Sequence, residues 1–397
     1  MNLTATIRER AGALTPLLLK IRHHLHRHPE LSFQERKTQG YLRDLLEKEG
    51  VRIAATPAGT GLLAELGHDE GPVIVLRADM DALPVQEETG LPFASQQEGV
   101  MHACGHDVHM TCVVGAALLL KELSSLWQGK VLFLFQPAEE KLPGGARQII
   151  EEKVLDPYRP ALIIGQHVDP LLVAGTVGYR PGAYMASSDE LYLTLSGRGG
   201  HAALPTAVTN TPLAAARTLI ALEEFVEKAH PRDLPSLLRF GKVLAPGATN
   251  VIPPKVFLEG TFRAFDEEWR SRIHRELPRL ATQTAATEGA QAQLEVKKGY
   301  PVLINDVEAI RQAIRFSEEY FGKKNVLPLD LRMTSEDFAY YSHHFPALFF
   351  RLGIRPPDRE ESPPLHSPHF IVHEPAITTG TGHLVWLTLS FLKVYGK

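Results

Sequence analysis

The chain has 397 residues, and this length favours two or three domains over one. It is 44% hydrophobic and 22% charged, which is the composition of a globular protein. The net charge of −4, with both signs interspersed, gives no electrostatic reason to expect nucleic acid or an anionic membrane as a partner. No apolar run approaches ~18 residues, so we expect neither a transmembrane helix nor a signal peptide. The default expectation is a cytoplasmic protein.

Two apolar patterns near the N-terminus have helical spacing, over residues 14–28 and 34–49. Pro29 breaks the first pattern and Gly50 ends the second. Four histidines crowd the first segment, and helical spacing spreads them around its axis. We therefore interpret them as a polar helix face and a capped C-terminus: His23, His24, His26 and His28.

Three short runs share one design, over residues 72–81, 130–140 and 161–167. Each is apolar, rich in β-branched or aromatic residues, and ends in Asp, Glu or His. Such runs, separated by helical segments, are typical of parallel strands buried on both faces. Ligands of open α/β sheets bind beyond the carboxyl ends of the strands. The polar strand ends therefore predict one site at one edge of the sheet.

The pattern changes between residues 185 and 298, where the predicted order βαββαβ is that of a ferredoxin-like unit. Pro278 falls inside its second helix and indicates a kink or a misplaced boundary. We predict an α/β protein with two domains, one with a mostly parallel sheet flanked by helices and one an inserted α+β ferredoxin-like domain. The first domain is predicted to be discontinuous, comprising residues 1–184 and 299–397, and the inserted domain covers residues 185–298.

The stretch MHACGHDVH, residues 101–109, places three imidazoles, a thiol and a carboxylate in nine residues. Cys104 and His106 can converge on one ion from an extended loop. By itself such a loop could equally be a solvated polar turn. The acidic strand ends favour a metal site, because several buried charges at one sheet edge need neutralisation. The two cysteines, Cys104 and Cys112, are too few for a disulfide scaffold and fit a reducing compartment.

Hydrolysis at two metals needs a base that is not itself a ligand. Glu139 and Glu140 are adjacent, so one carboxylate can bind metal while Glu139 acts as general base and then as general acid. A loop after the strand at 347–352 brings back a further histidine, for which His369 and His373 compete with His366. The predicted ligands are Cys104, His106, Glu140, His167 and His366.

These ligands do not select one metal. Thiolate and imidazole suit zinc, cobalt or nickel, and the carboxylate also admits manganese. We expect two divalent ions per subunit. Asp81 and Asp107 are predicted to accept hydrogen bonds that orient a ligating histidine.

Several motifs together resemble the aminoacylase and carboxypeptidase family of dinuclear metal amidohydrolases, in the branch of hippurate hydrolases and indoleacetic acid-amino acid hydrolases. They occur in family order over nearly the whole chain: RHHLHRHPELSFQE (22–35), LRADMDALPVQEETG (76–90), MHACGHDVH (101–109), LFQPAEE (134–140), GGHAALP (199–205), TSEDFAYY (334–341) and LHSP (365–368). The resemblance implies hydrolysis of an N-acyl-L-amino acid to a carboxylic acid and a free amino acid. It also implies that the discontinuous first domain is the catalytic domain, and that residues 185–298 form a lid or dimerisation domain through which such proteins often form homodimers or higher homo-oligomers.

The resemblance assigns roles to three lid residues. His201 matches a histidine that helps to polarise the scissile carbonyl, in relatives sometimes from the partner subunit. Asn250 and Arg263 match groups that hold the substrate carboxylate, a task that suits an Arg fork. The chain departs from the family pattern at Lys141, Leu142 and Thr206, near the expected pocket entrance.

The expected partner is a small N-acyl amino acid or a short peptide, and neither nucleic acid nor membrane. Two alternatives share the same metal site: a dipeptidase or carboxypeptidase, and a deacetylase of an N-acetylated amino-acid intermediate. A third alternative is a non-catalytic protein that binds a metal or a ligand. Such a protein would be expected to lack the base or a ligand, and this chain has both.

Overall fold

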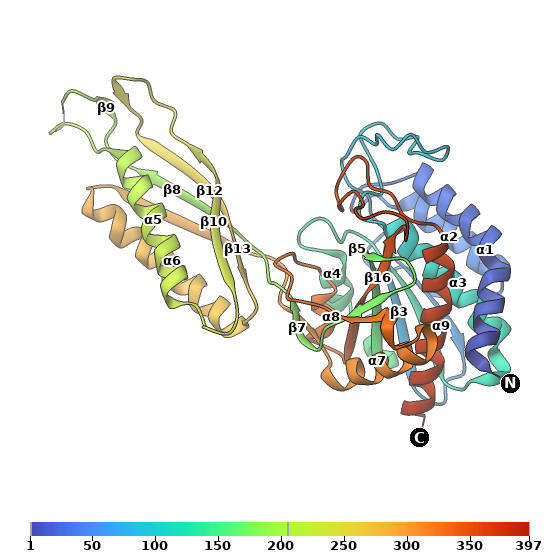
Figure 1. Ribbon diagram of the computed structural model, residues 1–397. Helices are drawn as coiled ribbons and strands as arrows, with labels where there is room; N and C mark the ends of the chain where they lie inside the picture. Colours follow the sequence, from blue (N-terminus) through green and yellow to red (C-terminus); the bar gives the residue numbers. More distant parts are fainter. Residues whose placement is uncertain (1, 205, 397) are drawn as a thin grey trace. The chain divides into compact units, whose positions relative to one another are not determined.

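The computed structural model describes residues 2–204 and 206–396, so Pro205 of the GGHAALP motif lies outside the described residues. The chain forms two compact units. The first contains the residues up to 182, residues 304–330 and those from 337 onward. The second contains residues 183–303 and 331–336. The elements of both units are labelled in Figure 1.

An eight-stranded sheet forms the centre of the first unit, in the order β1-β2-β4-β3-β5-β16-β6-β15. Its middle strands β4, β3, β5 and β16 are mutually parallel. They are buried over most of their length because helices cover them, and the last three residues of β5 are the main exception. The strands are β1 (Arg52–Ala55), β2 (Leu62–Gly67), β3 (Val73–Asp79), β4 (Lys130–Gln136), β5 (Leu162–Val173), β6 (Val177–Tyr179), β15 (Val326–Pro328) and β16 (Ala347–Arg355).

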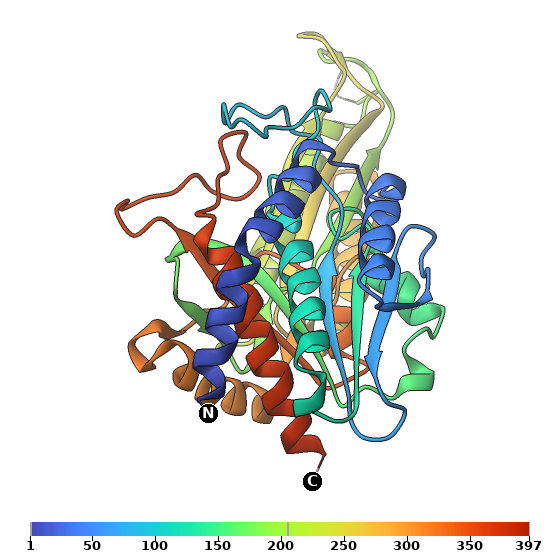
Figure 2. The same cartoon turned by 90° about the vertical axis from the view of Figure 1, so that its right-hand side faces the viewer.

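Helices α3 and α9 pack on the sheet and α1 packs on both, so these three helices lie together on one side (Figure 2). The helices of this unit are α1 (Leu3–Arg27), α2 (Arg36–Lys48), α3 (His106–Glu122), α4 (Gly145–Glu151), α7 (Val307–Phe321), α8 (Ala339–Ser342) and α9 (Pro375–Tyr395). Short 3₁₀ turns are η1 (Ser124–Leu126), η2 (Asp156–Tyr158) and η3 (Lys323–Asn325). In the part of the chain that the structure describes, no helix is both long and apolar enough to cross a bilayer.

The second unit is an antiparallel sheet of order β10-β12-β8-β13 with two helices packed on it. Its elements are β8 (Asp189–Ser196), α5 (Thr211–Ala229), β10 (Ser236–Leu244), β12 (Lys255–Ala264), α6 (Glu267–Thr287) and β13 (Gln291–Lys298). A short pair joins β9 (Gly200–His201) to β11 (Val251–Ile252). The boundaries between the two units fall within two further short strands that pair with each other, β7 (Gly182–Met185) and β14 (Leu303–Asn305). This topology confirms the predicted ferredoxin-like unit.

Two boundary expectations differ from the structure, and the alternative left open at Pro278 is decided against a misplaced boundary. The first helix begins at Leu3 rather than near residue 14, because the Asn2 side chain accepts the Ala5 N–H and caps it there. Pro278 lies inside α6, which continues to Thr287. The second unit extends to residue 303 and includes residues 331–336, which the sequence assigned to the first domain.

Candidate active site

Three predicted ligands meet at the carboxyl ends of the central strands of the first unit. His167 is on β5, and Cys104 and His106 come from the loop and first turn of α3. Their ligand atoms all lie within 4.8 Å of one another, and Cys104 Sγ is 3.4 Å from His167 Nε2. All three side chains are buried.

The backbone sets the tautomers of both imidazoles. His106 Nδ1 lies 2.8 Å from the carbonyl oxygen of Asp81, and His167 Nδ1 lies 2.7 Å from that of Val168. A carbonyl only accepts, so each Nδ1 holds the proton and donates it. Each Nε2 is therefore the ring nitrogen left for an ion, and it faces the same small space as the Cys104 sulfur.

A second group of donor atoms contains Cys104 again, with Glu140 and His366. Glu140 Oε1 is 3.3 Å from His366 Nε2. The His366 backbone has a φ of 65° and its N–H donates to the Ala103 carbonyl, which ties this loop to the MHACGHDVH stretch. His369, the alternative to His366, instead contacts the backbone carbonyl and the carboxylate of Glu88.

The donor atoms fit a divalent cation. Among the residues that the structure describes, the buried atoms without a hydrogen-bond partner include His106 Nε2 and Glu140 Oε1, which contact other groups of the site as ion pairs. Burial opposes protonation of His106, but the carboxylates of Asp79 and Asp81 raise its pKa to about 10. Burial, and then the Glu140 carboxylate, raise the pKa of the Cys104 thiol well above its usual value. Buried acids, imidazoles and a thiol around unpartnered atoms call for a cation, and this mixed donor set suits zinc, cobalt, nickel or manganese.

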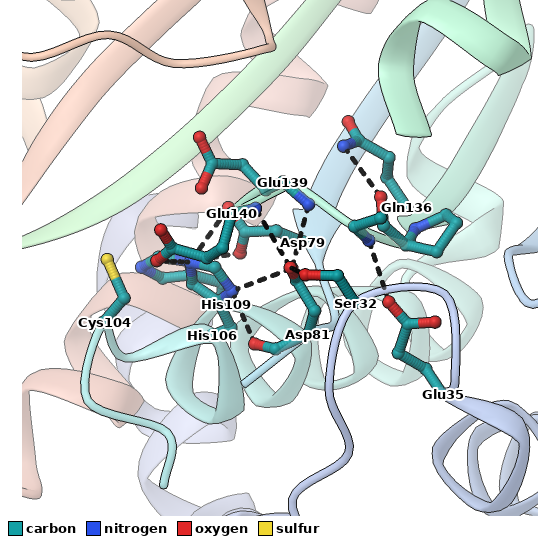
Figure 3. A network of polar contacts seen from close by, with 12 residues as sticks. Ser32, Glu35, Asp79, Asp81, Cys104, His106, His109, Gln136, Glu139 and Glu140 are labelled. Atoms are coloured by element: carbon teal, nitrogen blue, oxygen red, sulfur yellow. Dashed lines mark hydrogen bonds and ion pairs between the residues drawn. The ribbon is translucent and has the colours of Figure 1, made fainter. Parts of the chain in front are cut away.

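Asp81 positions the loop that contains both glutamates (Figure 3). Its two carboxylate oxygens each accept one backbone N–H, from Glu139 and Glu140, at 3.0 Å. Asp81 also accepts from Ser32 and lies 3.4 Å from His106 Nδ1. The side chain of Glu140 points toward Cys104, whereas that of Glu139 points away from the Asp81 carboxylate.

Asp107 does not orient a candidate ligand, in contrast to the prediction. Its carboxylate accepts from Arg22 Nε at 3.0 Å and lies 2.8 Å from His26 Nδ1. Both partners are on α1, because the first turn of α3 packs against that helix. His26 is therefore buried rather than part of a polar face, and its Nε2 lies 3.2 Å from Glu87.

Sequence reasoning missed the residues that support the ligands. His109 contacts Asp79 through Nδ1 at 2.6 Å and accepts the Val168 N–H through Nε2, so neither nitrogen is free for a metal. Asp79 also accepts from Arg77, which bonds Asp337 of the TSEDFAYY motif. Asp79 ends an apolar run, and that position was the available signal.

A protein-family model described as peptidase family M20/M25/M40 matches residues 75–387. The chain belongs to this family. It is 38% identical over 367 residues to N-acetyl-L-cysteine deacetylase of Bacillus subtilis, covering 92% of this chain and 86% of that protein. It is 37% identical over 369 residues to IAA-amino acid hydrolase ILR1-like 4 of Arabidopsis thaliana, covering 91% and 83%. The crystal structure of Bacillus subtilis YXEP, described as a dinuclear metal binding peptidase of the M20 family, matches with a TM-score of 0.84 and 34% identity, covering 96% and 99%.

M20 membership and the donor set together make the chain a divalent-metal-dependent amidohydrolase. The family resemblance read from the motifs is thereby confirmed. The hippurate hydrolase branch, the number of ions and their identity stay predictions.

The three lid residues of this M20 protein lie in the second unit. His201 on β9 pairs with Val251 on β11, and Asn250 accepts the Ala202 N–H next to it. Arg263 is near the other end of β12, where its guanidinium donates to Ser335 and burial lowers its pKa. Lys255, at the Asn250 end of β12, pairs with Ser196, and Phe262 pairs with Asp189. His201 and Asn250 are thus neighbours, whereas Arg263 lies roughly 26 Å away along the strand direction.

Proposed function

We propose that the protein hydrolyses the amide bond of N-acyl-L-amino acids, releasing a carboxylic acid and a free amino acid. The observation that supports this most strongly is the sharing of Cys104 between two groups of donor atoms, beside the Glu139 and Glu140 pair. We infer that Cys104, His106 and His167 hold one divalent ion, and that Cys104, Glu140 and His366 hold a second. These ions would supply Lewis acidity to the attacking water and the scissile carbonyl.

Glu139 is the general base in this proposal. Its carboxylate takes one proton from the water as the new C–O bond forms at the acyl carbon. When the C–N bond breaks, Glu139 returns this proton to the leaving nitrogen. Glu139 is buried, and its backbone N–H is bound by Asp81, so its side chain starts from a defined position.

Substrate binding is assigned to lid residues. We propose that Arg263 binds the substrate carboxylate with Asn250, and that His201 helps to polarise the carbonyl. Since Asn250 lies near one end of strand β12 and Arg263 near the other, the two would come from different subunits of a homodimer. The relatives named N-acetyl-L-cysteine deacetylase and IAA-amino acid hydrolase support small N-acyl amino acids as the substrate class.

The decisive test measures release of free amino acid from a substrate panel. The panel contains N-acetyl (including N-acetylcysteine), N-benzoyl and indoleacetyl amino acids, and dipeptides. The enzyme is stripped with a chelator and reloaded with zinc, cobalt, manganese or nickel. Activity on an N-acyl amino acid that disappears on stripping and returns with metal supports the proposal. Preference for dipeptides would replace it with a peptidase, and no turnover by folded, metal-loaded protein would contradict it.

A further inference from the structure

The motif RHHLHRHPELSFQE, residues 22–35, contributes neither a ligand nor the base to the proposed site. Its last five residues, LSFQE at 31–35, include Glu35, which is completely buried. Glu35 Oε1 accepts the backbone N–H groups of Ala138 at 2.8 Å and Phe33 at 3.0 Å. Glu35 Oε2 accepts the hydroxyl of Thr60 at 2.6 Å. Figure 3 shows Glu35 reaching the turn between Gln136 and Glu139.

This turn has an unfavourable backbone conformation. Ala138 has a φ of 51°, which is a left-handed conformation that a residue with a Cβ adopts only at a cost of about 1–2 kcal/mol. The turn is needed because the chain leaves buried β4 and must direct two consecutive side chains into the site. External hydrogen bonds must therefore hold it in place.

Three successive N–H groups supply these bonds. The amide of Ala138 donates to Glu35, and those of Glu139 and Glu140 donate to Asp81. Successive amides that converge on anionic oxygens form a nest, a known anion-binding arrangement of the backbone. Here the anions are two buried carboxylates of the chain itself, on the side of the loop opposite the Glu139 carboxylate.

We propose that Glu35 is a positioning residue for the loop of residues 138–140, the catalytic loop, and that its bond to Ala138 sets where Glu139 and Glu140 point. The proposal rests on the proposed function, in which Glu140 binds metal and Glu139 is the base. A packing role alone does not account for a carboxylate here. Burial raises the pKa of Glu35, and the neighbouring Asp81 raises it further, so an apolar side chain would fill this space at a lower cost.

Glu30, in the same motif, provides a matched control. Its carboxylate accepts the N–H and hydroxyl of Thr38 at 2.9 and 3.0 Å, in the first turn of α2. It therefore makes bonds of the same kind as Glu35 but does not touch the loop at residues 138–140. Glu30→Ala should lower the melting temperature while leaving kcat and metal affinity near wild type.

The experiment compares Glu35→Ala, Glu35→Gln and Glu30→Ala. Three quantities are measured: kcat and KM on the best panel substrate, the zinc dissociation constant by competition with a chromophoric chelator, and hydrogen exchange of the peptide covering residues 136–140. Glu35→Ala should lower kcat and zinc affinity by about 10–100-fold, which is typical of a lost residue behind a metal ligand, with a smaller change in KM. Exchange at residues 138–140 should accelerate.

Glu35→Gln should restore most of each loss. Its amide oxygen can still accept from Ala138 and Phe33, and its NH₂ group can donate to Thr60, whose hydroxyl rotates to accept. If Glu35→Ala does not fold, Thr60→Val provides a milder variant, which should reduce zinc affinity and kcat several-fold. Wild-type values in a folded Glu35→Ala or Thr60→Val protein would overturn the proposal, as would equal losses in Glu30→Ala.

The readouts separate this inference from the proposed function. A wild-type enzyme that turns over no panel substrate would contradict the proposed reaction. The zinc dissociation constant and hydrogen exchange would still test the role of Glu35, because neither measurement depends on the substrate.

Discussion

Nε2 of His366 lies 3.3 Å from Oε1 of Glu140, although one residue follows β4 and the other precedes α9. Cys104 joins these two residues in one donor group and joins His106 and His167 in another. This sharing predicts different metal contents for different variants. Cys104→Ser should lose most of both ions, whereas His366→Ala should lose chiefly one. The measurement is metal content per subunit by elemental analysis after gel filtration.

His109 is the matched control for that measurement. It is a buried histidine of α3, the helix that begins with the proposed ligand His106, but both of its ring nitrogens are already hydrogen-bonded. His109→Gln should retain both ions, with a loss of stability of about 1–3 kcal/mol for a disturbed buried hydrogen bond. Full metal content in Cys104→Ser, or loss of an ion in His109→Gln, would contradict the ligand assignment.

Glu139→Gln separates base chemistry from metal binding. The amide cannot take the proton from water, so kcat should fall by about 10²–10⁴-fold. Metal content should stay at the wild-type level because Glu139 is not a proposed ligand. Steady-state kinetics with parallel elemental analysis check both statements. Unchanged turnover would remove Glu139 from the mechanism.

Gly145 allows α4 to approach the catalytic loop closely. A Cβ at this position would lie 1.9 Å from the carbonyl oxygen of Pro137, so Gly145→Ala must displace the backbone just before Ala138. A shift near 1 Å can reduce turnover by about 100-fold. Gly40→Ala is the control, because its Cβ would meet no atom within 4 Å and it lies inside α2. Steady-state kinetics should therefore give a much lower kcat for Gly145→Ala than for Gly40→Ala. Equal kcat values would contradict a functional role for the close packing at Gly145.

The second unit contains a buried ion pair that predicts a pH-dependent stability. Burial alone would raise the pKa of Asp189, but hydrogen bonds from Arg270 and His274 lower it to about 2. Because the folded-state pKa lies below the usual 3.8, this carboxylate contributes about 2 kcal/mol above pH 4, and the contribution is lost as the pH falls toward 2.

Asp189→Asn should therefore lower the free energy of unfolding by about 3–5 kcal/mol at pH 7, because Arg270 stays buried with less compensation. Urea titrations at pH 7 and pH 3 should show a smaller difference from wild type at the lower pH. Glu224→Gln removes an exposed pair with Lys228 and should change stability little. An Asp189→Asn difference that is the same at both pH values would contradict the interpretation.

Subunit complementation tests the proposed dimer. His201→Ala and Arg263→Ala should each be nearly inactive alone. If each site takes Arg263 from one subunit and His201 from its partner, a mixed dimer has one complete site. Random pairing in a two-fold dimer should then restore roughly a quarter of wild-type activity. No restoration in co-expressed, co-purified protein would place both residues in one subunit's site or in none.

Local patterns in the sequence were sufficient for the fold and for the residue types of the site. The apolar runs at 72–81, 130–140, 161–167 and 347–352 correspond to β3, β4, β5 and β16. A strand that is buried on both faces appears in the sequence as a continuous apolar run, because every side chain along it lies in an apolar environment. The ends of those runs placed Asp81, Glu139 and His167 at one sheet edge, and the structure brings them there.

Tertiary structure decided what each polar atom is bonded to. His106 and His109 are three residues apart in one motif, yet only His106 has an unbonded buried nitrogen. Asp107 bonds to α1 rather than to a candidate ligand, and His26, expected on a polar face, is buried with it. The Ala138 turn depends on Glu35, which is distant in sequence. A buried polar atom must find its partner among groups that packing brings near, and residue spacing along the chain does not specify those groups.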